Sequence, residues 1–406
     1  MKILVLSQHF WPETFRITDI VRALADAGHN MRVLTGQPNY PAGRIFDGYR
    51  AGARGPQAMG GVPVHRVPLV PRGAGGAMRL ALNYLSFVAS ASLFGPRDVP
   101  GRKLDIVFVY ATSPLIQAIA GVVVARAKRA KLVVWVQDLW PESLAATGFV
   151  TSPALLGLVA RVVRWIYART DLILVQSEAF VAPVAALAPH GRIALLENPS
   201  DAPAPEATAA APALHLRPGF NIVFAGNFGA AQSLDTVLDA AELLRDLSDL
   251  RFVLVGSGRD SARLADAIAR RRLTNVEMPG RFPPEVMPAI FAQASALLVT
   301  LARAPIFALT VPSKVQTYLA AGRPILAALD GEGARVIAQA GAGLCVPAED
   351  AAALASAVRA LYATGAEERA AMGARGQAHH EQHYDMNVFV PRLIGMLETL
   401  IEARAA

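Results

Sequence analysis

Cysteine is nearly absent from this sequence. Cys345 is the only one in 406 residues, so no internal disulfide can form, which fits a reducing compartment. No apolar run reaches the roughly 18 residues that a membrane-spanning helix needs. The apolar run at the amino terminus ends at Leu6, too early for a signal peptide. These features predict a cytoplasmic protein.

Charge is also scarce. Charged residues make up only 17% of the chain, which excludes a disordered or coiled-coil composition. The net charge of +7 suggests an anionic partner, such as phosphate groups, a membrane surface or nucleic acid. A composition in which Arg replaces Lys explains the same charge without any partner. No RNA-recognition, zinc-finger or helix-turn-helix signature occurs, so no nucleic-acid partner is predicted.

The sequence also contains no D-x-D, the usual carboxylate pair for a metal-held diphosphate. No metal site is therefore predicted. Cys345 lies in GLCVP with no partner for a nucleophile, which favours a small core residue.

Short apolar runs do occur, and they alternate with stretches of helix length. Such alternation is typical of a parallel sheet covered by helices on both faces. Between the runs, 11 of the 18 residues at 201–218 are Ala or Pro, which indicates a linker. The predicted strands are residues 2–7, 31–35, 105–110, 132–136 and 171–177 before the linker, and 221–226, 251–258, 296–300 and 323–329 after it.

The predicted fold class is therefore α/β, with two doubly wound, Rossmann-like domains. The first domain is expected at 1–200, the linker at 201–219 and the second domain at 220–390. A final helix at 391–406 closes the second domain or returns to the first. Ligands bind beyond the carboxyl ends of strands in such sheets, so two halves that face each other would define a cleft.

The segment 78–95 is apolar over most of its circumference, with Arg72, Arg79 and Arg97 around it. Two interpretations fit equally well. One is a buried helix of the first domain. The other is a helix in a lipid interface, with the arginines on head groups. Asn83 and three serines make the segment too polar to span a membrane.

The second half contains glycine-bearing turns after two predicted strands. Gly226, Asn227, Phe228 and Gly229 follow the strand at 221–226 and precede an expected helix. Such a turn exposes backbone N–H groups to an anion, such as a diphosphate, although similar turns are common without any ligand. Gly256 and Gly258 repeat the arrangement, where a tight structural turn is at least as good an interpretation.

A more specific motif is PSKVQTYLAAGRP at 312–324. Its pattern predicts a helix that begins near Pro312 and ends near Gly322, with Ser313 and Lys314 in the first turn. A lysine there opposes the helix dipole unless an anion lies between them. The motif thus favours an anion bound beside Lys314 over a lysine that is merely solvated.

The stretch VQDLWPESLAATG at 136–148 follows a predicted buried strand. It places the carboxylates Asp138 and Glu142 around Trp140 and Pro141, a pair that is expected to be exposed. The same residues also suit the start of a helix, with Asp138 as cap and Pro141 and Glu142 in the first turn.

Together these motifs resemble a known family. GNFGAAQSLDTVLDAA, GRFPPEVMP and PSKVQTYLAAGRP are similar to the second half of family 4 glycosyltransferases with the GT-B fold. SQHFWPETFRITDIVRALADAGH, TGQPNYPAGRIFDGY and VQDLWPESLAATG resemble the fucosamine (L-FucNAc-type) transferases of O-antigen, capsule and colanic acid assembly. The resemblance covers nearly the whole chain.

The resemblance implies a retaining, metal-independent hexosyltransferase without a cofactor. The donor is expected to be a UDP-sugar bound by the second domain. The acceptor, a saccharide or a sugar on a polyprenyl diphosphate, is expected against the first domain. This places the protein in the cytoplasm or peripherally at the inner face of the cytoplasmic membrane.

The resemblance also assigns donor-binding residues. Asn227 and Gln232 occupy positions where many members have Arg and Lys, and Thr317 replaces the second of two glutamates, near the ribose. Lys314 and Ser313 are expected to stabilise the leaving diphosphate instead. The expected donor-binding set is Gly226, Asn227, Phe228, Gly229, Gln232, Gly256, Gly258, Arg281, Phe282, Ser313, Lys314 and Thr317.

The acceptor side is expected in the first domain. Gln137 replaces a histidine of many members, and an amide cannot act as a general base. Asp138 and Glu142 are expected to orient acceptor hydroxyls and Trp140 to stack on a sugar. Arg16 is expected to reach the donor diphosphate or to pair with a nearby acid. The catalytic candidates are Asp138, Lys314 and Arg16, and the acceptor-binding candidates are Trp11, Glu13, Phe15, Asp138, Trp140 and Glu142.

Two other functions fit this fold. A UDP-sugar 2-epimerase needs acid and base side chains at the sugar, which Gln137 and Thr317 do not provide. A non-catalytic subunit that binds a nucleotide sugar or lipid carrier agrees with the departures from the family motifs.

Overall fold

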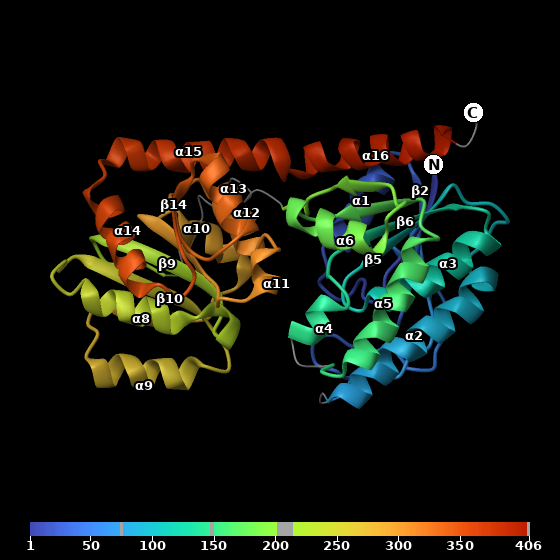
Figure 1. The fold of residues 1–406 in the computed structure, drawn as a ribbon, viewed down its shortest axis with the longest axis horizontal. Coiled ribbons are helices and arrows are strands. Elements are labelled where there is room, and N and C mark those ends of the chain that lie inside the picture. Colours follow the sequence, from blue (N-terminus) through green and yellow to red (C-terminus); the bar gives the residue numbers. More distant parts are fainter. Residues whose placement is uncertain (74–75, 147–149, 201–213, 404–406) are drawn as a thin grey trace. The chain divides into compact units, whose positions relative to one another are not determined.

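The computed structural model describes residues 1–73, 76–146, 150–200 and 214–403 (Figure 1). The chain forms two compact units. Unit 1 comprises Met1–Glu197 and Phe389–Ala406, and unit 2 comprises Asn198–Val388. Each is described by itself below.

Unit 1 is built on an eight-stranded sheet in the order β3-β4-β2-β1-β5-β6-β7-β8. Neighbouring strands are parallel, except that β3 and β4 form an antiparallel pair at one edge. The strands are β1 (Lys2–Leu6), β2 (Asn30–Thr35), β3 (Gly55–Met59), β4 (Val62–Arg66), β5 (Ile106–Ala111), β6 (Lys131–Val136), β7 (Leu172–Val175) and β8 (Ile193–Leu195).

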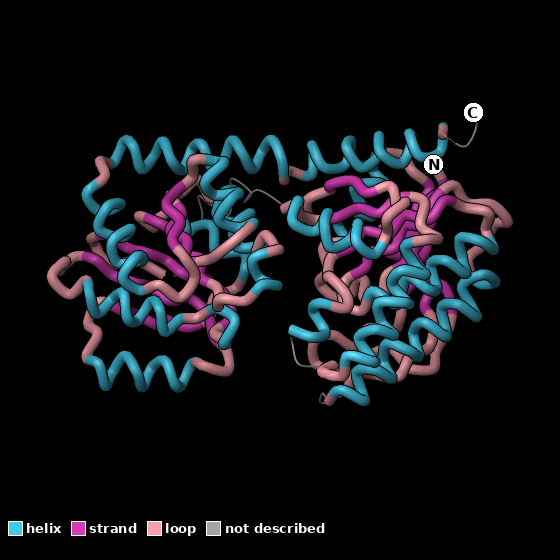
Figure 2. Tube along the Cα trace, viewed as in Figure 1, coloured by secondary structure: helices cyan, strands magenta, loops and turns pink. Residues whose placement is uncertain are grey.

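Helices cover this sheet (Figure 2). They are α1 (Ile17–Asp26), α2 (Ala77–Asp98), α3 (Ala118–Ala127), α4 (Glu142–Ala146), α5 (Pro153–Tyr167) and α6 (Val181–Leu187), with short 3₁₀ turns at η1 (Leu115–Gln117) and η2 (Glu178–Phe180). The last helix of the chain, α16 (Met386–Glu402), belongs to unit 1 from Phe389 onward. There Phe389 stacks on Trp135 of β6, with 5.5 Å between ring centroids.

Unit 2 contains a fully parallel six-stranded sheet in the order β11-β10-β9-β12-β13-β14. Its strands are β9 (Phe220–Asn227), β10 (Leu250–Ser257), β11 (Val276–Gly280), β12 (Ala296–Thr300), β13 (Ile325–Ala328) and β14 (Gly343–Val346). Its helices are α8 (Leu234–Leu243), α9 (Ser261–Arg271), α10 (Met287–Phe291), α11 (Pro305–Ala308), α12 (Ser313–Ala320), α13 (Glu332–Ala340), α14 (Ala351–Ala363) and α15 (Ala366–His383), with 3₁₀ turns η3 (Ala230–Gln232) and η4 (Pro284–Val286).

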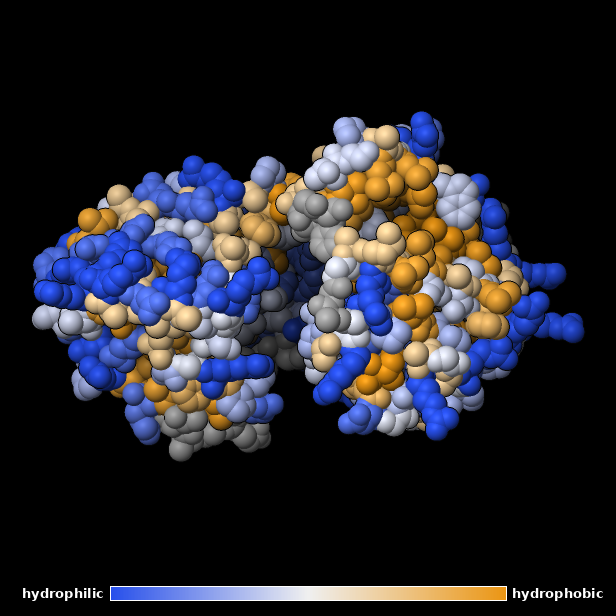
Figure 3. All heavy atoms as spheres, turned by 90° about the horizontal axis from the view of Figure 1, so that it is seen from below, coloured by the Kyte–Doolittle hydropathy of each residue, from blue (hydrophilic) through white to orange (hydrophobic). Residues whose placement is uncertain are grey.

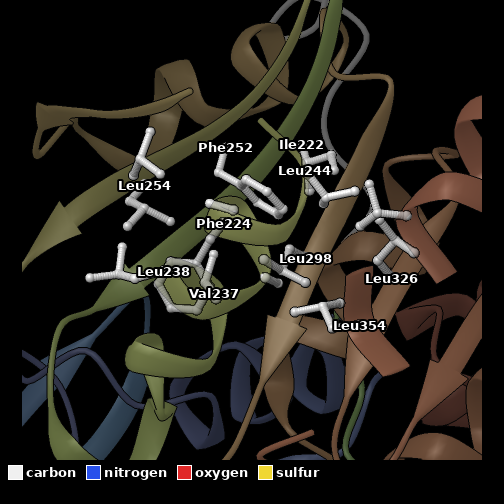
Figure 4. Packing of buried hydrophobic residues seen from close by; sticks show 14 of the residues in the cluster. Ile222, Phe224, Val237, Leu238, Leu244, Phe252, Leu254, Leu298, Leu326 and Leu354 are labelled. Carbon is white, nitrogen blue, oxygen red and sulfur yellow. The ribbon is translucent and has the colours of Figure 1, made fainter. Parts of the chain in front are cut away.

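Both faces of this sheet are buried. Ile222 and Phe224 of β9 pack with residues of α8 and α14, such as Val237, Leu238 and Leu354 (Figure 4). Val223, the residue between them, packs on the opposite face with residues of α10, α12 and α13. Because successive side chains of a strand point to opposite faces, a continuous apolar strand is what a sheet covered on both sides requires.

The structure confirms the predicted α/β class with two doubly wound units, and a strand occurs at each predicted strand position. Two helix boundaries differ from the sequence pattern. After the glycine-bearing turn, η3 intervenes and α8 begins only at Leu234, because Ser233 adopts φ +45°. The final helix begins at Met386 rather than near residue 391.

Part of the predicted linker, residues 201–213, lies outside the described residues. The part that follows is tied to unit 2. The side-chain amide of Gln293 donates to the Leu214 carbonyl at 3.0 Å and accepts from the Leu216 N–H at 3.1 Å.

Helix α2 contains the apolar segment 78–95. It is long and apolar enough to cross a membrane by length and composition, with a mean hydropathy of 1.2. One face nevertheless packs in unit 1, along α3, and buries Asn83, Phe87 and Val88. The opposite face is exposed, and its contact with lipid stays a prediction. Hydrophobic residues gather over unit 1 on the side of α2 and α5 (Figure 3).

Candidate functional site

The carboxyl ends of β9 and β10 approach each other closely in unit 2. Gly226 pairs with Gly256 across the two strands, and a Cβ at Gly256 would lie 1.9 Å from the Gly226 carbonyl oxygen. Gly226 has φ +151°, and a Cβ there would lie 2.6 Å from Cε of Lys314. Glycine at both positions therefore lets the strand ends and the lysine share one small space.

Lys314 extends from the first turn of α12 toward this strand end. Its Nζ lies 3.8 Å from the centroid of the Phe224 ring and donates a hydrogen bond to Oε1 of Gln232. Gln232 belongs to η3, directly after the glycine-bearing turn. The predicted association between the 226–232 turn and Lys314 thus exists in the fold.

Burial changes the acid–base behaviour of this lysine. Desolvation lowers the pKa of Lys314 to about 7, because the charged ammonium is disfavoured away from water. The group is therefore poised to gain a full charge when an anion arrives beside it.

A pocket of about 560 Å³ opens at this edge of the unit 2 sheet. Eight of the predicted donor-binding residues line it, namely Gly226, Asn227, Gly256, Arg281, Phe282, Ser313, Lys314 and Thr317. They come from β9, β10, the segment after β11, and α12, which are far apart in the sequence. The hydroxyl of Thr317 donates to the Ser313 carbonyl at 3.1 Å, so in this state it is used within its own helix.

Four residues predicted for donor binding do not line the pocket, and one of them, Gln232, instead accepts the hydrogen bond from Lys314. The Phe228 side chain is only 1% exposed and packs on Phe224 in the core, so the contact of this residue with a donor stays a prediction. The Gly258 N–H donates to Oγ of Ser261 at 2.8 Å and thus serves the turn into α9, the structural alternative considered for this glycine. Gly229 lies in the turn, away from the pocket lining.

The pocket also contains residues that sequence reasoning missed. Met287, Phe291 and Tyr318 contribute apolar walls. The Tyr318 hydroxyl accepts the Ala225 N–H at 3.0 Å, which holds the end of β9 against α12. Tyr318 follows Lys314 by four residues, so the two lie on the same face of α12, and this spacing could have indicated a place in the pocket. A tyrosine in an apolar helix is equally typical of the core, so the spacing alone did not decide.

In unit 1, the loop between β1 and α1 carries four of the predicted residues. Trp11, Glu13, Phe15 and Arg16 line a pocket of about 300 Å³. The Glu13 side chain is buried, and its carboxylate accepts the N–H groups of Asn39 and Tyr40, both at 2.7 Å. Its other oxygen lies 3.0 Å from Nδ1 of His9. Glu13 thus organises the loop, and its role in acceptor binding stays a prediction.

The stretch after β6 differs from the expectation in one respect. Trp140 is buried, at 6% exposure, rather than exposed, and its ring N–H lies 3.2 Å from Oδ2 of Asp138 and 3.3 Å from Oγ of Ser113. A buried ring with its polar edge occupied does not stack on a sugar as it stands. Glu142 is exposed at the start of α4.

Asp138 is partly buried at this strand end. Burial raises its pKa, while hydrogen bonds with Ser143, Ser113 and Trp140 oppose the rise. Such a carboxylate can accept a hydrogen bond from a hydroxyl-bearing ligand.

Two family models match this chain, one in each unit. The family model for the glycosyl transferase 4-like domain matches residues 14–199, and the model for glycosyl transferases group 1 matches residues 219–364. The two matches coincide with most of unit 1 and most of unit 2.

Two curated relatives match over most of their length. WcaI of Escherichia coli (strain K12), whose name describes a colanic acid biosynthesis glycosyl transferase, is 29% identical over 79% of this chain and 82% of its own. WbjE of Pseudomonas aeruginosa, whose name describes a glycosyltransferase, is 27% identical over 68% of this chain and 71% of its own.

Solved structures share the fold. Sucrose-phosphate synthase of Thermosynechococcus elongatus superposes with a TM-score of 0.71 at 16% identity, covering 99% of both chains. Anabaena HepE in complex with UDP superposes with a TM-score of 0.67 at 16% identity, covering 98% of this chain and 100% of its own. These architectures define a two-domain glycosyltransferase fold of the GT-B class. This chain belongs to the family 4 glycosyltransferases within that class.

Proposed function

We propose that this glycosyltransferase moves a sugar, with retention of configuration, from a UDP-sugar to a lipid-linked or saccharide acceptor in surface polysaccharide biosynthesis. The observation that carries the proposal is the pocket of unit 2, where Lys314 lies beside the turn at Gly226. The named relative in colanic acid biosynthesis supports the pathway, and the UDP complex of HepE supports the nucleotide. The motif resemblance of the sequence favours an N-acetylated deoxyhexosamine such as FucNAc as the sugar.

The pocket supplies what a leaving nucleoside diphosphate requires. Backbone at the Gly226 strand end approaches without a side chain in the way, and Lys314 supplies a cation in a partly desolvated site. Fixed positive charge beside a developing phosphate charge is an effective way to stabilise a transition state. Arg281 and Phe282 are proposed to contact the base, and Thr317 the ribose.

The reaction balances without a protein base. The bond between the sugar's anomeric carbon and the β-phosphate oxygen breaks, and a bond from the acceptor oxygen to that carbon forms on the same face. The acceptor hydroxyl loses its proton to the departing phosphate oxygen, and UDP leaves. The protein then contributes positioning and charge, with Lys314 at the diphosphate, Asp138 at the acceptor hydroxyl and Arg16 as a further cation.

We also propose that the enzyme works without a metal at the inner face of the cytoplasmic membrane, where the exposed side of α2 contacts lipid. The absence of a D-x-D pair from the sequence and the exposure of Met78, Leu82 and Leu85 support these two points.

The test is a panel of nucleotide sugars with a lipid-linked sugar acceptor, in buffer with and without EDTA, read by mass spectrometry and by NMR of the new linkage. Transfer from a UDP-sugar with retained configuration and no effect of EDTA is expected. Binding of UDP without transfer by folded protein would favour a non-catalytic subunit. Interconversion of UDP-sugars without acceptor would favour an epimerase. Either result would overturn the proposal.

A further inference from the structure

A polar cluster surrounds Arg72 at the carboxyl edge of the unit 1 sheet. Arg72 lies between β4 and α2, and its guanidinium carbon is 5.1 Å from the centroid of the Tyr40 ring. Its backbone N–H donates to Oδ1 of Asn39 at 3.2 Å. No carboxylate among the residues that the structure describes forms an ion pair with Arg72. A cation that is fixed in this way is available to an anion.

The cluster continues from Arg72 to Asp138. Burial raises the pKa of the Tyr84 hydroxyl, while the charge of Arg72 and a hydrogen bond with Ser113 oppose the rise. Ser113 is exposed and also hydrogen-bonds with Asp138. Arg72, Tyr84, Ser113 and Asp138 thus form one arc, with a cation at one end and a carboxylate at the other.

An apolar surface adjoins this arc on α2. Both α2 and the segment that leads to α5 follow strands of the parallel set, so both helices begin at the edge that carries the arc. On α2, Met78 is 76% exposed, Leu82 48% and Leu85 56%, at the spacing of one helix face.

Helix α5, which the sequence did not single out and which packs on α3 as α2 does, also carries exposed apolar residues. Leu155 is 46% exposed and Leu158 51%, while Trp165 lies 4.4 Å from the guanidinium carbon of Arg169. The segments 72–97 and 151–170 contain three arginines each and no Asp or Glu. An apolar surface whose own segments carry only positive charge complements an anionic lipid surface.

We propose that the arc binds the phosphate and the sugar of a lipid-linked glycosyl phosphate. Arg72 and the Tyr84 hydroxyl hold the phosphate, and Asp138 accepts a hydrogen bond from a sugar hydroxyl. The lipid tail stays in an anionic bilayer against α2 and α5. An amphiphile of this kind matches both parts of the surface, whereas a free oligosaccharide matches only the polar part. This inference rests on the proposed function and names its acceptor class.

The test compares two acceptors that differ only in phosphate, an alkyl diphosphate-linked sugar and the alkyl glycoside of the same sugar. Arg72→Gln is expected to raise KM for the diphosphate acceptor by roughly 10- to 100-fold, as loss of a charged hydrogen bond would. Its effect on the glycoside is expected to be small, and Arg72→Lys is expected to restore part of the loss. Arg102→Gln, which changes an exposed arginine in the loop before β5, is the matched control and is expected to leave both KM values unchanged.

A second readout does not depend on turnover. Sedimentation uses phosphatidylcholine vesicles with and without a polyprenyl diphosphate. Extra binding to the lipid diphosphate is expected for the parent protein and for Arg102→Gln, and its loss is expected for Arg72→Gln. Equal KM increases for both acceptors, or no diphosphate-dependent binding by the parent protein, would overturn the inference. Failure of the proposed function is distinguished by UDP-sugar hydrolysis without acceptor and by UDP binding, which depend on unit 2 and are expected to persist in Arg72→Gln.

Discussion

At the scale of single residues, Lys314 is central to the proposed chemistry. Lys314→Met keeps the apolar stem against Phe224 but removes the charge. Turnover is expected to fall about 10²- to 10³-fold, as when one group that stabilises the transition state is removed. The unfolding temperature is expected to stay the same or rise, because burial disfavours the charged lysine.

Release of UDP measures the change in turnover, and thermal unfolding measures the change in stability. Lys103→Met, which removes an exposed lysine of unit 1, is the control. Equal turnover in Lys314→Met and the parent protein would contradict the role assigned to Lys314.

The same lysine predicts proton uptake on ligand binding. Its pKa of about 7 in the free protein means that it is largely neutral at pH 8 and that a diphosphate beside it raises the pKa again. UDP binding at pH 8 is therefore expected to take up close to one proton, and binding well below pH 7 almost none. Calorimetry in buffers of different ionisation enthalpy measures this number. Uptake by Lys314→Met equal to that of the parent would contradict the assignment.

Lys314 also makes the stability of the free protein depend on pH. Its pKa is lower in the folded than in the unfolded state, so between about 7 and the ordinary value of 10.5 the unfolded chain binds more protons. The contribution of this residue to unfolding free energy therefore increases as pH rises through that window. The destabilising effect of burying charged Lys314 is fully present below its pKa of about 7 in the folded protein.

Burial of individual site residues was the least predictable feature. The sequence assigned Gly226, Arg281 and Lys314 to one site, and they do line one pocket, because strand ends and helix starts follow from local patterns. It did not predict the burial of Phe228 and Trp140, since an aromatic residue in a strand-end loop can point to the core or to solvent. Only packing against segments distant in the sequence decides between core and solvent for such a side chain, and a local sequence pattern does not contain this information.

At the scale of elements, α2 has two different faces. Leu82→Gln combined with Leu85→Gln changes the exposed face alone, so the fold is expected to persist. Binding to anionic vesicles is expected to drop at least about tenfold, because each exposed leucine that enters lipid contributes roughly 1.5–3 kcal/mol. Co-sedimentation measures it, with Leu243→Gln on α8, where the leucine is 52% exposed, as control. Unchanged binding by the double variant would exclude α2 as a lipid contact.

Element boundaries were predictable where residues close in the sequence determine them. The start of α12 at Ser313 and the positive φ of Gly322 agree with the pattern around Pro312. The start of α8 was not predictable, because the left-handed Ser233 and the turn η3 depend on contacts with other segments. One such contact is the hydrogen bond of 2.5 Å from the Thr300 hydroxyl to the Gln232 carbonyl. Strands β3 and β4 were missed because polar and proline residues interrupt their apolar pattern.

At the scale of the whole molecule, the two proposed sites lie in different units. The pocket with Lys314 lies within unit 2, and the arc from Arg72 to Asp138 lies within unit 1. Repetition of strand and helix in both halves of the sequence was sufficient to predict this architecture. The assignment of donor and acceptor to the two units remains a prediction.

The most direct test of the account is a structure of the protein with bound UDP. The account predicts the diphosphate at the Gly226 turn, with a β-phosphate oxygen about 2.7–3.2 Å from Nζ of Lys314. The uracil ring is predicted beside Arg281 and Phe282. UDP bound at any other place, with this pocket empty, would contradict it.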